Sequence, residues 1–103
     1  MPVRNEASFL PGCIKDISSQ TINEIELVIV DDRSTDTTSR VLKEYSKRDP
    51  RIRMSNTKHE GIISALNTGL DECKGHYIAR MYADDRMDKT RLEKQLKLMK
   101  SNP

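Results

Sequence analysis

The sequence predicts an α/β domain of three layers, α-β-α, in which a mostly parallel sheet lies between two layers of helices. Short apolar runs alternate with helical patterns along the 103 residues, which is typical of a parallel sheet covered by helices. One run, Leu27-Val28-Ile29-Val30, is continuous and rich in β-branched residues, as expected of a strand buried on both faces. Right-handed crossovers then place helices on both faces of the open sheet.

The elements are expected in the order β-α-β-α-β-α-β-α. Strands are predicted within residues 1–5, 27–30, 51–54 (an edge strand) and 77–83. Ser34 or Thr35 is expected to cap the second helix and Asp88 the last one. The buried sides of the four helices are predicted from apolar residues at helical spacing: Leu10, Cys13, Ile14 and Ile17; Val41, Leu42 and Tyr45; Ile63, Leu66, Leu70 and Cys73; Leu92, Leu96 and Met99.

Composition limits the classes of function. The net charge is +2 and both signs are interleaved, which gives no electrostatic case for a nucleic-acid partner. No apolar run approaches the ~20 residues of a membrane span, and no signal peptide opens the chain. Cys13 and Cys73 lack metal-ligand spacing and are interpreted as buried apolar residues in a reducing compartment. We therefore expect a cytoplasmic chain, with any membrane association of a full-length protein provided by other segments.

Two predicted strands end in paired acids, Asp31-Asp32 and Asp84-Asp85. Adjacent carboxylates raise each other's pKa, so a divalent cation or donors from a nucleotide would compensate their charge. Open α/β sheets bind ligands at the carboxyl ends of their strands, where both pairs are expected. Hard oxygen ligands favour Mg²⁺ or Mn²⁺. The alternative is that the acids only cap helices or remain solvated at the starts of loops.

Gly61 opens the third predicted helix, where a backbone can approach an anionic ligand closely. This signal is weak alone. The chain has no P-loop and no G-x-G-x-x-G, which argues against a nucleoside triphosphatase or a dinucleotide enzyme.

Four segments in order resemble the family 2 glycosyltransferases, and the likeness covers the whole chain. Pro2-Val3-Arg4-Asn5-Glu6 is similar to the family's "P-x-x-N-E" loop, and ELVIVDDRSTDTT to its "E-I-I-V-D-D-G-S-x-D-x-T" segment. GIISALNTGLDECKGHYIARMYADD resembles the block that ends in D-A-D-D, and RLEKQ the helix that follows it. The resemblance implies a Rossmann-like sheet, a partial GT-A fold. Residues 1–103 would be the N-terminal nucleotide-sugar-binding part of a glycosyltransferase domain, truncated at both ends.

The resemblance also implies roles for residues. The nucleobase would be held by the first loop and Asp32, with Asp31 in support, and the Gly61 region and Asn67 would border the donor pocket. Asp84 would bind the Mg²⁺ or Mn²⁺ that bridges the donor diphosphate, together with Asp85. The sugar would pass to an unidentified saccharide or lipid-linked acceptor, and the catalytic base would lie beyond Pro103, so the isolated chain is expected to be inactive. The residues implied for the donor site are Pro2, Val3, Arg4, Glu6, Asp31, Asp32, Gly61, Asn67 and Asp84.

The chain departs from the family pattern at three positions. Tyr82 stands where the first Asp of D-x-D usually lies, which removes one donor contact and weakens metal binding. Arg4 replaces an aromatic residue beside the base, although a guanidinium also stacks on rings. Arg33 replaces the glycine that usually follows the two aspartates, which constrains that turn.

The first strand is expected at the centre of the sheet, between the second and the last. Only Met1 precedes the proline, so shortening this strand would leave backbone groups unpaired at ~1–3 kcal/mol for each buried group. We therefore expect self-association through apolar faces or strand edges.

Two alternatives differ in class. A non-catalytic nucleotide-binding domain is consistent with Tyr82. A phospho-receiver domain shares the length and a "V-I-V-D-D" strand end, but places its acidic pair after the first strand, whereas a β-α unit precedes it here.

Overall fold

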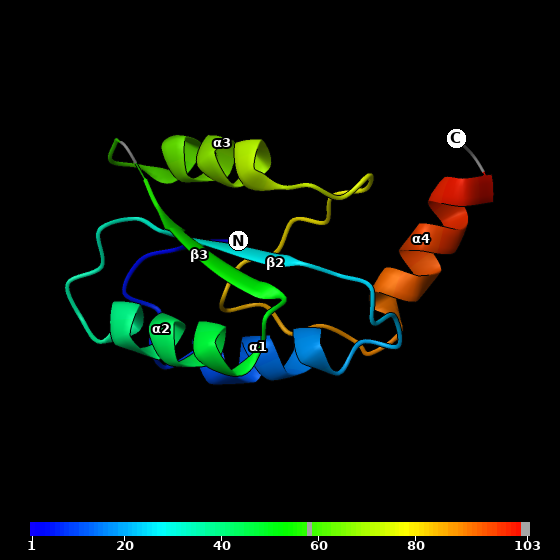
Figure 1. Ribbon diagram of the computed structural model, residues 1–103, viewed down its shortest axis with the longest axis horizontal. Coiled ribbons are helices and arrows are strands. Elements are labelled where there is room, and N and C mark those ends of the chain that lie inside the picture. The colour runs from blue at the N-terminus through cyan, green and yellow to red at the C-terminus, as the bar shows by residue number, and fades with distance from the viewer. Residues whose placement is uncertain (58, 102–103) are drawn as a thin grey trace.

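The computed structural model describes residues 1–57 and 59–101, and it has the predicted three-layer α/β architecture (Figure 1). A parallel sheet in the order β1-β2-β3 separates α1 and α2 on one face from α3 on the other. The elements are β1 (Pro2–Val3), α1 (Leu10–Ser18), β2 (Leu27–Asp31), α2 (Thr38–Arg48), β3 (Ile52–Asn56), α3 (Ile62–Glu72) and α4 (Arg91–Ser101). The predicted edge strand near residue 52 is thus confirmed as β3.

The register brings the carboxyl ends of the three strands to one edge of the sheet. Val3 pairs with Asp31, and Asp31 pairs with Asn56 on the other side. Each strand end is followed by a loop, so the loops that begin at residues 4, 32 and 57 lie next to one another. This edge is where an open α/β sheet binds its ligand.

The fourth predicted strand does not form, and this changes the predicted strand order. Residues 77–83 have no ladder pairing in the structure, so β2 is the central strand and β1 lies at the edge of the described sheet. The carbonyl groups of Met1 and Val3 accept from the N–H groups of Val30 in β2 and of Asp32 directly after it. The backbone N–H and C=O groups of successive residues point to opposite sides of a strand. The backbone groups of Pro2 therefore point away from β2, and proline has no N–H to donate on that side. Ala83 still packs in the same apolar cluster as Val3.

The buried side of α3 is not the one predicted. Ala65 and Gly69 are buried, whereas Ile63 is 74% exposed and Leu70 is 51% exposed. A Cβ at Gly69 would lie 3.4 Å from a methyl carbon of Val30, so the helix lies close against the sheet by presenting its small residues. Larger apolar side chains would hold the helix farther from β2, and they are displaced to the outer side.

Several large apolar side chains are exposed on α3 and on the irregular segment after it: Ile62, Ile63, Leu70, Tyr77 and Ile78. Exposed apolar surface of this kind favours association between chains. The self-association expected from the sequence stays a prediction.

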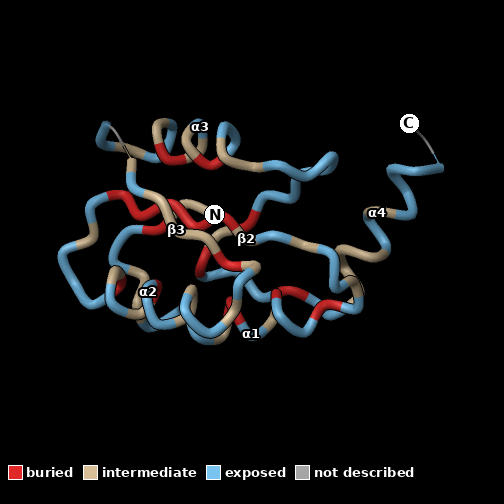
Figure 2. The backbone as a smooth tube through the Cα atoms, viewed as in Figure 1, coloured by how far each residue is buried: buried red, intermediate tan, exposed pale blue. Residues whose placement is uncertain are grey.

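The core divides into clusters on the two faces of the sheet (Figure 2). Between the sheet and α1 and α2, Leu10, Ile29 and Leu42 are fully buried. A second cluster, also on the α1 side of the sheet, joins Cys13 and Ile17 of α1 to Met81 and Met87. The predicted stripe of α1 is therefore confirmed in full. Cys73, in contrast, is only half-buried, and both cysteines are free thiols.

The last helix projects from the body of the domain in Figure 1 and buries none of its residues. Leu92 is half-buried and packs against the cluster of Cys13 and Ile17, whereas Met99 is 51% exposed, so the predicted inner side of α4 is confirmed at its first residue and wrong at its last. Asp88 accepts from the Thr90 N–H just before the helix, as expected of a residue that caps it. Among the described residues, no helix has the length and apolar character needed to cross a membrane.

The Cys13 thiol predicts a loss of stability in alkaline solution. Burial raises the pKa of Cys13 from 9.0 to about 11, because the thiolate is poorly solvated in the core. The unfolded chain loses this proton first. Stability is therefore complete below pH 9 and falls as the pH rises toward 11, by about 2–3 kcal/mol from this group. Urea unfolding at pH 8.5 and pH 11 measures the change, and Cys13→Ala should lose this part of the pH dependence. Equal pH dependence in both chains would contradict the prediction.

Candidate functional site

The candidate site lies at the carboxyl edge of the sheet, where the loops after β1 and β2 meet the loop before α3. Asp31 and Asp32 end β2 and are 5% and 6% exposed. Buried carboxylates need hydrogen-bond donors or cations, so their partners define what the site can do.

Asp32 links β2 to both neighbouring loops. Its backbone N–H donates to the Val3 carbonyl at 2.8 Å. Its carboxylate accepts from the Gly61 N–H at 3.2 Å, at the start of α3, and from the Thr57 hydroxyl at 3.2 Å. The residues predicted to hold a nucleobase and to border the donor pocket are therefore adjacent. The same bonds partly occupy the Asp32 carboxylate.

Ser34 holds the side chain of Asp31 through two hydrogen bonds. The Asp31 Oδ1 atom accepts from the Ser34 hydroxyl at 2.6 Å and from the Ser34 N–H at 3.2 Å. Ser34 is thus not the cap of α2, which has Thr37 at its N-cap position. The residue predicted as a cap instead closes the turn that follows the two acids.

Asn5 is a residue that the predicted site omitted. It has a positive φ of 52°, and its side-chain oxygen accepts from the N–H groups of Thr35 at 2.8 Å and Asp36 at 3.2 Å. Its own N–H donates to the Ser34 hydroxyl. Asn5 therefore joins the loop after β1 to the loop after β2. The signal in the sequence was the Asn of the "P-x-x-N-E" segment, because asparagine tolerates this backbone conformation and bonds nearby backbone groups.

Arg33 has a φ of 56°, which confirms the expected constraint on its turn. The left-handed region costs residues with a Cβ about 1–2 kcal/mol relative to right-handed backbone. We expect the free energy of unfolding of Arg33→Gly to exceed that of Arg33→Ala by about 0.5–1 kcal/mol. The difference is smaller than the full strain because glycine loses more backbone entropy on folding. Both variants lose the same side-chain contacts, so urea melts of the pair isolate the backbone term. Equal stability of the two would contradict the strain.

Arg4 and Glu60 form an ion pair across the mouth of the site. The Arg4 Nη1 atom lies 3.4 Å from the Glu60 carboxylate, and both side chains are at least half exposed. Next to Glu60, Gly61 has a φ of 111° and ψ of 160°, a conformation that favours glycine. The backbone conformation thus gives a reason for glycine here that the sequence did not predict, while the space around a Cβ is open. The predicted close approach of a ligand to Gly61 stays a prediction.

Glu6 is near enough to the second acidic pair to be affected by its charge. Partial burial raises the pKa of Glu6, and the negative charges of Asp84 and then Asp36 raise it further. The Glu6 N–H donates to the Thr38 hydroxyl. Asp84 therefore lies near the loop after β1, which is bonded to the first residue of α2.

Asp84 and Asp85 lie in a turn on the protein surface. The Asp85 side chain accepts from the Tyr82 N–H at 3.2 Å, and the Asp85 N–H donates back to the Tyr82 carbonyl. Within residues 1–57 and 59–101, no three or more His, Cys, Asp or Glu side chains form a group that could hold a metal ion. The two carboxylates still fit Mg²⁺ or Mn²⁺ chemically, because these ions commonly use one or two carboxylates with substrate phosphates.

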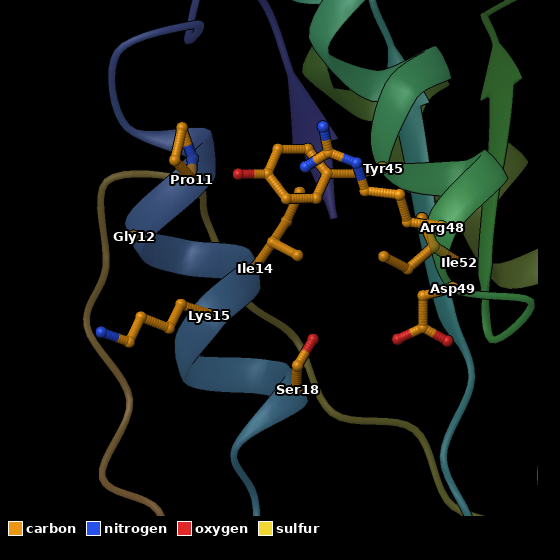
Figure 3. A pocket seen from close by; sticks show the side chains of 9 residues that line it. All are labelled: Pro11, Gly12, Ile14, Lys15, Ser18, Tyr45, Arg48, Asp49 and Ile52. Atoms are coloured by element: carbon orange, nitrogen blue, oxygen red, sulfur yellow. The ribbon is translucent and has the colours of Figure 1, made fainter.

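Asn67 shares a surface hollow with the loop before α3. It is exposed on α3, where it lines this hollow of about 540 Å³ with His59, Glu60 and Ile63 among others. A second hollow of about 490 Å³ lies between α1 and α2, with Ile14, Tyr45 and Ile52 in its lining (Figure 3). It contains none of the predicted site residues, and Ile52 is at the amino end of β3, away from the carboxyl edge. The role predicted for Asn67 stays a prediction.

An open parallel sheet with buried carboxylates at its carboxyl edge defines an α/β domain of the class that binds its ligand at that edge. The family model described as "Glycosyl transferase family 2" matches residues 1–103, and the chain belongs to this family. It is 37% identical over 93 residues to a chondroitin synthase of Escherichia coli, covering 90% of this chain and 14% of that protein. The chain thus spans only a small part of the length of such curated relatives.

Solved structures agree on the fold. Staphylococcus aureus TarS, solved with UDP-GlcNAc, matches with a TM-score of 0.86 and 22% identity over 97% of this chain and 30% of that one. At this identity the likeness shows the fold alone. A mannosyltransferase of Pyrobaculum calidifontis, PcManGT, solved with GDP-Man and Mn²⁺, matches with a TM-score of 0.63 and 28% identity, over 71% of this chain and 23% of that one. The predicted family and the GT-A type of fold are both confirmed.

Proposed function

We propose that residues 1–103 are the N-terminal, nucleotide-sugar-binding part of a glycosyltransferase that moves a sugar from a nucleotide-diphosphate-sugar to an acceptor. The observation that carries the proposal is the meeting of the Glu6 loop, Asp32 and Gly61 at one sheet edge, with Asp84 close enough to raise the Glu6 pKa. Membership of the family supports the same reading. The phospho-receiver alternative is not supported, because the family match covers the whole chain.

In this proposal the donor occupies two subsites, one for the nucleobase and one near the start of α3. The loop of Pro2, Val3, Arg4 and Glu6, together with Asp32, would hold the nucleobase, while Asp31 supports the Ser34 turn. The Gly61 N–H at the start of α3 would lie near the donor and is held there by Asp32. Arg4, whose guanidinium pairs with Glu60, would stack on the ring of the base.

Asp84 and Asp85 would hold a Mg²⁺ or Mn²⁺ ion, with phosphate oxygens completing its coordination. The bound ion would neutralise the charge that builds on the departing nucleoside diphosphate. PcManGT, solved with GDP-Man and Mn²⁺, supports this choice of metal. The acceptor is proposed to be a saccharide or a lipid-linked molecule.

A titration with nucleotide tests the proposal. UDP and GDP are each titrated into the chain by calorimetry, with and without Mn²⁺. We expect one of them to bind, and to bind more tightly with the metal. If neither binds under either condition, the donor-site proposal is wrong.

The second candidate is a non-catalytic nucleotide-binding domain, favoured by Tyr82 at the position of the first Asp of D-x-D. The same titration separates the two candidates. Nucleotide binding with the same affinity in the presence and absence of Mn²⁺ would favour the non-catalytic domain. The proposed glycosyltransferase would need the metal to neutralise the negative charge on the leaving nucleoside diphosphate.

A further inference from the structure

The segment that carries Asp84 and Asp85 lacks the anchor that a strand would provide. We call residues 82–85 the acidic turn. Residues 77–83 before it form no ladder with β1, and inside the turn the Asp85 backbone N–H bonds only to the Tyr82 carbonyl. Something other than the sheet must therefore place the two carboxylates at the carboxyl edge.

The side chain of Asp16, on α1, forms hydrogen bonds with the residues directly after the acidic turn. Its carboxylate accepts from Arg86 Nε at 2.6 Å and from Arg86 Nη2 at 3.0 Å, a two-pronged contact. The Met87 N–H donates to the same carboxylate at 2.9 Å. The Asp16 side chain is 14% exposed and Arg86 is 75% exposed, so the bond to the Met87 N–H is better shielded from water than the ion pair. The contact joins residues 70 positions apart in the sequence.

Gln20, just after α1, holds the next residues in the same way. It is 4% exposed, and its amide nitrogen donates to the Asp88 carbonyl at 2.8 Å. Its amide oxygen accepts from the Leu92 N–H at 3.2 Å. Thr21 adds a backbone bond from its N–H to the Lys89 carbonyl. A buried amide with both ends bonded fixes backbone position closely, because each lost partner would leave a polar group unsatisfied.

Apolar packing supports both ends of the turn from the same helix. Met81 before the turn and Met87 after it are buried, and both pack in the cluster of Cys13 and Ile17. The Cys13 thiol also contacts the Tyr82 carbonyl at 3.9 Å. The acidic turn is thus bracketed by residues that rest on α1.

We propose that Asp16 and Gln20 are positioning residues that hold the acidic turn beside the Glu6 loop, and that they thereby set the affinity of the donor site for its metal. The inference rests on the proposed function, since it takes Asp84 and Asp85 as metal ligands. Neither Asp16 nor Gln20 touches the donor. They act through Arg86, Met87 and Asp88, in place of the missing strand ladder.

The test compares Asp16→Ala with a matched control. Asp49→Ala is suitable because Asp49 makes the same kind of contact at the far end of the sheet, accepting from Arg51 Nε, Nη2 and N. The affinity for the nucleotide that binds is measured with and without Mn²⁺. We expect Asp16→Ala to lower the gain from Mn²⁺ about ten-fold, with the metal-free affinity unchanged. Asp49→Ala should leave both affinities unchanged, and Asp16→Asn, which keeps an acceptor oxygen, should show a smaller loss. Gln20→Leu should repeat the pattern from the other contact.

Hydrogen exchange of the Asp85 amide gives a readout that needs no ligand. We expect faster exchange at this amide in Asp16→Ala and not in Asp49→Ala. If the unaltered chain binds no nucleotide, the proposed function fails, and the exchange result still decides whether Asp16 positions the turn. An unchanged gain from Mn²⁺ in a folded Asp16→Ala chain overturns the proposal, even where exchange becomes faster. Should Asp16→Ala not fold, Asp16→Asn decides by the same measurements.

Discussion

Asp32→Asn is expected to weaken nucleotide binding about 10- to 100-fold, measured by calorimetry with the nucleotide that the chain binds. A hydrogen bond to a charged group contributes about 1.5–3 kcal/mol, and the neutral amide loses that strength. The amide nitrogen would also face the donors Gly61 N and Thr57 Oγ1, which now point at a carboxylate. The start of α3 is then expected to move away from β2.

Asp36→Asn is the matched control for this substitution. Asp36 lies in the same loop and accepts from the Thr38 N–H at 2.9 Å, but it is exposed, whereas Asp32 is buried. We expect its variant to bind nucleotide as tightly as the unaltered chain. If Asp32→Asn is folded, by far-ultraviolet circular dichroism, and binds normally, Asp32 is not part of the donor site.

Asp84→Asn is expected to abolish the effect of Mn²⁺ on nucleotide binding while leaving metal-free binding intact or slightly improved. Asp84 is exposed at the surface, so its substitution should remove a metal ligand with little effect on the fold. Removing a negative charge beside a diphosphate also lessens repulsion in the absence of metal. The measurement is the ratio of the two dissociation constants with and without Mn²⁺, which should fall to about one.

A substitution at Tyr82 tests the same site in the opposite direction. Tyr82→Asp would restore the first acid of the D-x-D pattern and should increase the gain from Mn²⁺. Its backbone N–H, which bonds the Asp85 carboxylate, is kept in the variant. A folded Asp84→Asn chain that retains the full effect of Mn²⁺ would place the metal elsewhere.

Much of the fold was predictable from the sequence, because its signals are local. β2 is a continuous apolar run, and α1 has apolar residues at helical spacing. Both elements form where they were expected. The prediction failed on α3 for a reason that is not local. Periodicity favoured its large apolar residues, whereas the space above Val30 admits only Ala65 and Gly69.

The candidate site was predicted in part. The paired acids and Gly61 were identified, since carboxylates after a buried strand and a glycine before a helix are visible as patterns. Asn5 was omitted from the predicted site, because the pattern names the residue and not its two backbone partners after β2. The turn of Asp84 was expected at a strand end, and it is instead an irregular turn held from α1.

The sequence by itself determined the family, the three-layer class and the chemical nature of the site, because strand burial and paired carboxylates depend on residue type and order. Only the tertiary structure decided which strands pair and what holds the acidic turn. Residues 77–83 form no ladder with the outer edge of β1, and the residues that follow the acidic turn are bonded to Asp16 of α1 and to Gln20 just after it. Contacts between residues some 70 positions apart depend on how the layers meet, and no local pattern records that.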